Sequence, residues 1–136
     1  MPLISLLRPC IAVLCCGGLY ASFVMLRKYH SARRGELAEA SVVMSPNARL
    51  ARVPNAYIGL IYYALLLVVT PFLSPAHPLI LEAALVASAL AALASVYLAY
   101  SLLFVTRMPC VFCWTGHVIN WCLLGVLLVL AKTPPR

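Results

Sequence analysis

The sequence of 136 residues contains neither aspartate nor glutamine, and it has only three glutamates. Charged residues make up 10% of the chain, whereas hydrophobic residues make up 65%. A soluble domain normally carries roughly a quarter charged residues and about half apolar ones. The shortage of charge excludes an ordinary soluble globular domain, a disordered chain and a coiled coil. We therefore expect an all-α integral membrane protein that forms a single domain over residues 1–136.

The basic excess needs its own explanation, because ten Lys and Arg residues give the chain a net charge of +7. In a soluble chain this excess would indicate nucleic-acid binding. Here the basic residues lie only between long apolar runs, and the sequence has no basic face with interleaved aromatics. We therefore expect no nucleic-acid partner, and we interpret the charges as those of membrane loops in contact with lipid headgroups and water.

Four apolar segments each approach the roughly 20 residues that a helix needs to cross about 30 Å of hydrocarbon. Three of them begin at a proline, which the start of a helix tolerates. The pattern predicts a four-helix bundle whose two chain ends lie on one side, with one long loop over residues 27–53. The expected transmembrane helices cover about 9–26, 54–73, 78–105 and 109–131.

Basic residues divide unequally between the two sides of this expected bundle. Seven of the ten lie in the long loop or in the loop between the third and fourth helices. The positive-inside rule therefore predicts that this side faces the cytoplasm, in a cell membrane of the plasma or inner type. The residues on this side are Arg27, Lys28, Arg33, Arg34, Arg49, Arg52 and Arg107.

Two of the six cysteines, Cys110 and Cys113, form a CxxC pair at the start of the fourth segment. The unpaired N–H groups and the dipole of a helix N-terminus stabilise a thiolate, and thiol–disulfide exchange uses this arrangement. A zinc site needs a second pair of ligands, and a c-type haem needs histidine where Trp114 stands, so we expect no metal. Two cysteines that pack as small apolar residues are the alternative.

Three motifs resemble, in order and spacing, the vitamin K epoxide reductase family of membrane four-helix quinone/disulfide oxidoreductases. The second segment reads VPNAYIGLIYY over residues 53–63, and the third ends with SVYLAY over residues 95–100. The fourth begins with the CxxC pair and continues to VIN over residues 118–120. The resemblance covers nearly the whole chain and includes Tyr20 and Ala21 in the first segment.

The resemblance implies a thiol:quinone oxidoreductase that supports protein disulfide formation. The usual arrangement in this family places the active face outside the cytoplasm, which is the alternative to the orientation that the basic residues predict. Cys113 would pass electrons to a membrane quinone such as ubiquinone or menaquinone, and Cys110 would exchange with a thioredoxin-like partner protein. The resemblance also implies that Asn55 hydrogen-bonds a quinone carbonyl. Four further positions match those that line the quinone pocket: Ile58, Gly59, Tyr62 and Tyr63. From the residues alone, Asn55 could instead satisfy N–H groups of the first helical turn, and the tyrosines could be interfacial aromatics.

The sequence departs from the family pattern at two places. Family members have a tyrosine four residues after the second CxxC cysteine, where this chain has His117. Residues four apart share a helix face, so His117 could donate a hydrogen bond or a proton to the quinone, or favour the Cys113 thiolate. A hydrogen-bonded packing histidine is the alternative. The family also carries a relay pair of cysteines in the first loop, where this chain has Ala38 and Ala40.

The missing relay leaves two hypotheses open. Either a partner protein exchanges directly with Cys110, or the chain is a non-catalytic membrane bundle or binding subunit that has lost turnover. Cys15 and Cys16 do not replace the relay, because they lie roughly 10 Å deeper in the membrane than the CxxC pair, beyond the Cα separation of ~7 Å that a disulfide allows. We expect them, together with Cys122, to pack as apolar residues, and a disulfide among these three is the alternative.

Overall fold

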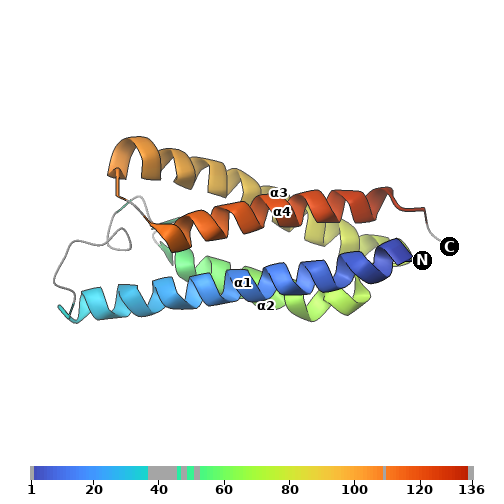
Figure 1. Ribbon diagram of the computed structural model, residues 1–136, viewed down its shortest axis with the longest axis horizontal. Helices are drawn as coiled ribbons and strands as arrows, with labels where there is room; N and C mark the ends of the chain where they lie inside the picture. Colours follow the sequence, from blue (N-terminus) through green and yellow to red (C-terminus); the bar gives the residue numbers. More distant parts are fainter. Residues whose placement is uncertain (1, 37–45, 47–48, 51–52, 109, 135–136) are drawn as a thin grey trace.

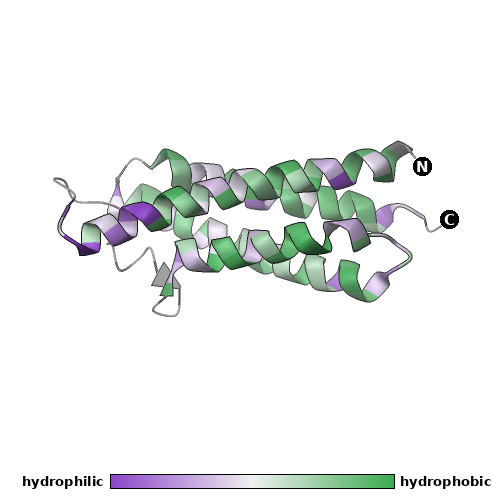
Figure 2. Ribbon diagram, turned by 90° about the horizontal axis from the view of Figure 1, so that it is seen from below, coloured by the Kyte–Doolittle hydropathy of each residue, from purple (hydrophilic) through white to green (hydrophobic). Residues whose placement is uncertain are grey.

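A computed structural model describes residues 2–36, 46, 49–50, 53–108 and 110–134 of the chain. Four long helices run side by side, and the first begins at the same end of the bundle at which the fourth ends (Figure 1). We call this the terminal end and the opposite one, which carries the CxxC pair, the cysteine end. All four helices are long and apolar enough to cross a membrane, and hydrophobic residues cover most of their length (Figure 2). The expected all-α, multi-pass fold is confirmed.

The first helix is longer than the sequence predicted. α1 spans Pro2–Arg33 and contains Pro9, whereas the expected span covered about 9–26. Transmembrane helices tolerate proline, because neighbouring groups satisfy the backbone carbonyl that it frees. Past residue 26 the chain stays helical although it is basic, since Arg and Lys are good helix formers whose charged ends reach water. The long loop therefore begins near Arg34, and α1 extends beyond the other helices at the cysteine end (Figure 1).

The second and third helices follow their expected bounds closely but change geometry before they end. α2 spans Asn55–Val69 and continues as a 3₁₀ turn, η3, over Thr70–Phe72. α3 spans Pro78–Tyr100 and continues as a π-helix, η4, over Ser101–Thr106. The sequence predicted an uninterrupted third helix to residue 105, and hydrophobic periodicity carries no signal for the switch from α to π geometry.

The fourth helix, α4, spans Val111–Lys132 and has Cys110 as its N-cap. Two short strands, β1 over Arg49–Leu50 and β2 over Val53–Pro54, pair antiparallel immediately before α2. These strands were not predicted. Four positions that bear on the sequence predictions lie outside the described residues: Ala38, Ala40, Arg52 and Pro109.

The helices pack in a ring that is loose at one place. α1 packs along both α2 and α4, and α4 packs along α3, whereas α2 and α3 touch at few points. The α2–α3 seam is therefore the loosely packed side of the bundle, and it leaves room for a cavity between helices.

The tightest packing lies toward the terminal end. In lipid, packing contacts rather than removal of apolar surface from water stabilise such a core, because the surrounding chains are themselves apolar. Arg8 of α1 also donates a hydrogen bond from Nε to the carbonyl oxygen of Leu73, at 2.9 Å. Five large side chains of this region are completely buried: Ile11, Leu73, Leu123, Leu127 and Leu130.

Candidate active site

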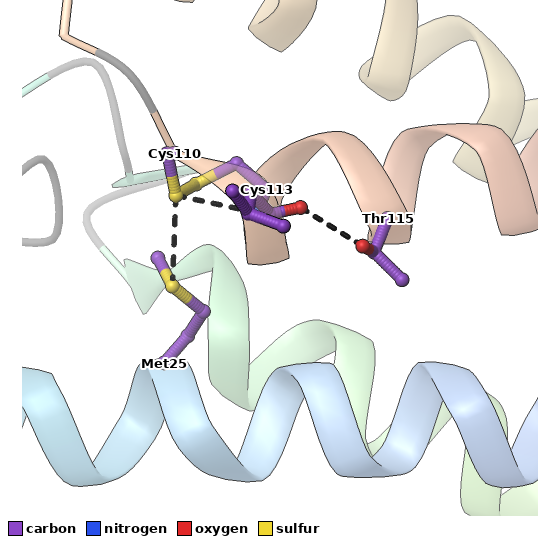
Figure 3. Close-up of a disulfide and its surroundings, with 5 residues drawn as sticks. Met25, Cys110, Cys113 and Thr115 are labelled. Atoms are coloured by element: carbon purple, nitrogen blue, oxygen red, sulfur yellow. Dashed lines mark hydrogen bonds between the residues drawn. A yellow bond between two sulfur atoms is a disulfide. The ribbon is translucent and has the colours of Figure 1, made fainter.

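The CxxC pair forms a disulfide at the N-terminus of α4 (Figure 3). The Cα atoms of Cys110 and Cys113 lie 5.3 Å apart. Cys110 has an extended backbone and caps the helix, because its Sγ accepts a hydrogen bond from the backbone N–H of Cys113 at 3.3 Å. The predicted position of the pair at a helix N-terminus is confirmed, with the refinement that Cys110 precedes the helix and only Cys113 lies inside it.

Side chains of α1, among them those of Met25 and Lys28, cover this end of α4. The Sδ of Met25 lies 3.8 Å from the Sγ of Cys110 (Figure 3). A disulfide sulfur carries no hydrogen, so this is a van der Waals contact between two polarizable atoms rather than a hydrogen bond. The Nζ of Lys28 lies 5.3 Å from the ring centre of Phe112, within the range of a cation–π contact. The sequence did not predict either residue as part of the site, since neither belongs to a recognisable motif.

A cavity of about 150 Å³ lies between the four helices beside the disulfide. Cys113 lines this cavity, whereas Cys110 lines a separate, shallow surface groove with Val111 and Trp114. The two cysteines therefore line different surfaces, although Sγ of Cys110 also contacts Met25, a residue of the cavity wall. Every residue that the sequence predicted for the quinone pocket lines the same cavity: Asn55, Ile58, Gly59, Tyr62, Tyr63 and His117. The structure brings these side chains together, and their role in quinone binding stays a prediction.

Small side chains create the cavity along the loose α2–α3 seam. Gly59 of α2 and three small residues of α3, Ala91, Ala94 and Ser95, line it. Ile58 also lines the cavity and is 39% exposed at the outside of the bundle. The cavity thus extends toward the surface that would face lipid.

Asn55 is the first residue of α2, and Pro54 holds the N-cap position without a side-chain capping bond. Within the described part of the chain, the Asn55 amide makes no hydrogen bond. The alternative that Asn55 satisfies the orphan N–H groups of the helix is therefore not supported. Its donor is available to a ligand in the cavity.

Tyr63 is only 3% exposed and is not an interfacial aromatic. Its hydroxyl donates to Oδ1 of Asn120 at 2.7 Å, and Nδ2 of Asn120 donates to Oγ of Ser95, also at 2.7 Å. This polar chain joins α2, α4 and α3 across the cavity wall. Gly18 of α1 makes it possible, because a Cβ at that position would overlap the Tyr63 ring. Tyr62 in turn shares a hydrogen bond of 2.8 Å with Ser88.

His117 lies one turn after Cys113 on α4, is 5% exposed and lines the cavity. Its ring packs against Trp114 and Trp121, with ring centres 6.1 and 6.4 Å away. Among the described residues it has no hydrogen-bond partner. The alternative of a hydrogen-bonded packing histidine is therefore not supported, and the imidazole is available to a ligand.

Several polar residues of this site were not predicted from the sequence. Ser95 and Asn120 were noted only as parts of motifs, and Ser101 was not noted at all. The signal that could have found them is their polarity, because a polar side chain within a transmembrane helix usually faces the bundle interior. The other four cysteines form no disulfide: Cys15 is buried, as expected of apolar packing, whereas Cys10, Cys16 and Cys122 are exposed on the helices.

Two comparisons with known proteins bear on this arrangement. A search of curated proteins found no match to the chain. The sequence profile of the Vitamin K epoxide reductase family matches residues 9–128 and so includes the cysteine pair and all the cavity residues named above. Because the match spans most of the chain, this multi-pass membrane protein belongs to the vitamin K epoxide reductase family of oxidoreductases.

Proposed function

We propose that the protein is a membrane thiol:quinone oxidoreductase, in which the Cys110–Cys113 pair passes two electrons from a partner dithiol to a membrane quinone. The observation that carries the proposal is that the two bonded cysteines line different surfaces. Cys113 lines the interior cavity, and Cys110 lines the surface groove. A disulfide that can be reached from two sides is suited to exchange thiols on one side and to reduce an acceptor on the other.

In the first half-reaction, a thiolate of the partner attacks Sγ of Cys110. The bond between Cys110 and Cys113 breaks, and Cys113 leaves as a thiolate. The N-terminus of α4 stabilises this leaving group, because Cys113 lies in the first helical turn beside unpaired N–H groups. The second thiol of the partner then displaces Cys110, so that the partner is oxidised to a disulfide and the CxxC pair is reduced to a dithiol.

In the second half-reaction, Cys113 and Cys110 form their disulfide again while the quinone takes up two electrons and two protons and becomes a quinol. The Asn55 amide donates a hydrogen bond to a carbonyl oxygen, which stabilises the negative charge that develops there. His117 lies one turn from Cys113 on the same helix, so its imidazole can pass a proton between the thiol and the substrate.

The lining of the cavity favours a lipid-soluble substrate. Aromatic and aliphatic side chains surround a small number of polar groups, as in most sites for small molecules. The α2–α3 seam provides a direct route for an isoprenoid tail, because the exposed Ile58 connects the cavity with the lipid-facing surface. Ubiquinone and menaquinone both meet these requirements.

The partner must reach Cys110 without a relay, because the sequence has alanine at 38 and 40. Cys110 is half-buried at the cysteine end, next to the surface groove. We therefore propose that a thioredoxin-like protein exchanges with Cys110 directly. The excess of basic residues on this side leads us to propose that the exchange takes place in the cytoplasm.

The test is quinone reduction by purified protein with a small dithiol and a short-chain ubiquinone or menaquinone analogue. Cys113→Ala is expected to lower the rate to the uncatalysed background. Cys122→Ala is the matched control, because Cys122 lies on the same helix but faces outward, and it is expected to keep the parent rate. Equal rates in the parent and in Cys113→Ala would instead support the non-catalytic bundle.

A further inference from the structure

Ser101 lies where α3 changes into the π-helix η4, and it lines the cavity. The residue is 4% exposed, and its hydroxyl oxygen is buried without a hydrogen-bond partner in the described part of the chain. A buried hydroxyl that lacks a partner is costly, so such groups are rare in native proteins. An unsatisfied donor on a cavity wall indicates that the partner is a ligand.

Other buried hydroxyl groups of the bundle show the contrast. Thr70 donates to the carbonyl oxygen of Leu66 at 2.7 Å. Ser88 and Ser95 are paired with Tyr62 and Asn120 respectively, at 2.8 and 2.7 Å. Helical packing therefore satisfies these three hydroxyls, whereas Ser22 of α1 and Ser101, which both line the cavity, have no hydrogen-bond partner among the described residues. Of these two, Ser101 has the hydroxyl oxygen that is fully buried.

The backbone conformation also changes at Ser101. The N–H of Ser101 donates to the carbonyl oxygens of Tyr97 and Leu98, four and three residues earlier, and the π-helix η4 begins at Ser101. π-helical segments occur frequently at functional sites, because they reorient side chains that a regular helix would hold elsewhere. The switch occurs at Ser101 itself, on the helix that faces α2 across the seam.

We propose that the hydroxyl of Ser101 donates a hydrogen bond to one ring carbonyl oxygen of the quinone while Asn55 donates to the other. The inference rests on the proposed quinone reduction and adds a second headgroup contact to it. The two carbonyl oxygens of a para-quinone lie on opposite edges of its ring, so they require donors from two walls. Asn55 belongs to α2 and Ser101 to the α3–η4 junction, and both line the cavity that Cys113 and His117 line from α4.

The test compares Ser101→Ala, which removes the hydroxyl, with Ser101→Thr, which keeps it. Ser101→Ala is expected to raise the KM for a short-chain quinone by about tenfold, the value of one lost hydrogen bond. The KM for the dithiol and the thermal unfolding temperature are expected to stay at the parent values. Ser101→Thr is expected to restore most of the quinone affinity.

Thr70→Val is the matched control, because it removes a buried hydroxyl near the terminal end, outside the cavity. Its KM for quinone is expected to equal that of the parent. A parent-like KM in Ser101→Ala, or an equal rise in Ser101→Ala and Ser101→Thr, would overturn the inference while quinone reduction by the parent still stood. Failure of the parent itself to reduce quinone above Cys113→Ala would overturn the proposed function instead.

Discussion

The two ends of the bundle differ in what fills the space between the helices. Near the terminal end, large apolar side chains such as Leu123 and Leu127 are completely buried. Toward the cysteine end, Gly59, Ala91 and Ser95 leave a cavity, and the polar groups of Asn55 and His117 border it. The same four helices are thus closely packed over one half and hollow over the other.

This difference assigns stability to the packed half of the bundle and the open site to the half that contains the cavity. A cavity forfeits packing contacts, and in lipid those contacts are the main stabilising interaction between helices. The packed half holds the helices in place, so the other half can keep an open site. The hydrogen-bonded chain of Tyr63, Asn120 and Ser95 lies beside the cavity and ties α2, α4 and α3 together where the α2–α3 packing is weak.

The largest effect is expected from His117→Phe at the cysteine end. Loss of a group that moves a proton during quinone reduction is expected to lower kcat by about 100-fold. Phenylalanine can keep the packing against Trp114 and Trp121, so the unfolding temperature is expected to change little. Steady-state quinone reduction measures the effect, and His77→Phe, in the loop at the terminal end, is the control. An unchanged kcat in His117→Phe removes the proposed role.

Leu127→Ala tests the packed half. The substitution is expected to lower the free energy of unfolding by about 2 kcal/mol, because the cavity that it creates loses packing contacts on all sides. The KM for quinone is expected to stay unchanged, since Leu127 does not line the site cavity. Unfolding by denaturant in detergent measures the loss. Leu128→Ala, at a position that is 46% exposed, is expected to be nearly neutral, and an equal loss in both variants would contradict the packing argument.

Ala91→Leu tests the half of the bundle that contains the cavity, because it fills space where Leu127→Ala creates it. Three additional carbon atoms on the cavity wall are expected to raise the KM for quinone by about tenfold, since they occupy the space of the headgroup, with no loss of stability. Initial rates measured over a range of short-chain quinone concentrations give the KM. Ala64→Leu adds the same atoms at an exposed position of α2 and is expected to leave KM unaltered. If Ala91→Leu kept the parent KM, the cavity would not be the binding site.

The last prediction concerns which side of the membrane each end of the bundle faces, and its substitutions are expected to leave the rate of quinone reduction unchanged. Arg33→Cys at the cysteine end is expected to react with a membrane-impermeant maleimide only after the cells are opened. Lys132→Cys at the terminal end is expected to react in intact cells. The parent protein gives the background labelling of its own cysteines. Labelling of Arg33→Cys in intact cells would reverse the proposed orientation.

Much of the fold could be predicted from the sequence, because helix length and apolar composition are local properties. The bounds of α2 and α4 agree with the predicted spans to within a few residues. The extension of α1 to Arg33 was missed, since hydropathy marks where a helix leaves the membrane and not where it ends. The π geometry of η4 was missed because hydrophobic periodicity carries no signal for the switch from α to π geometry.

The candidate site divides in the same way. The CxxC spacing and the family motifs identified Cys113, Asn55 and His117, and these residues do line one cavity. The spacing and the motifs could not show that Gly18 makes room for the Tyr63 ring. These two residues lie on different helices and approach each other only when the helices pack. The unsatisfied hydroxyl of Ser101 was equally hidden, since a serine in an apolar segment shows nothing about its partners.

The sequence by itself determined that this chain crosses the membrane four times and carries a redox-capable cysteine pair at a helix N-terminus. It did so because the scarcity of charge and the position of CxxC after a loop are properties of short segments. Only the tertiary structure decided that Cys113 lines the interior cavity and Cys110 the surface groove. Cys110 and one face of α4 form the groove, whereas the cavity requires all four helices, which pack tightly on three sides and loosely between α2 and α3.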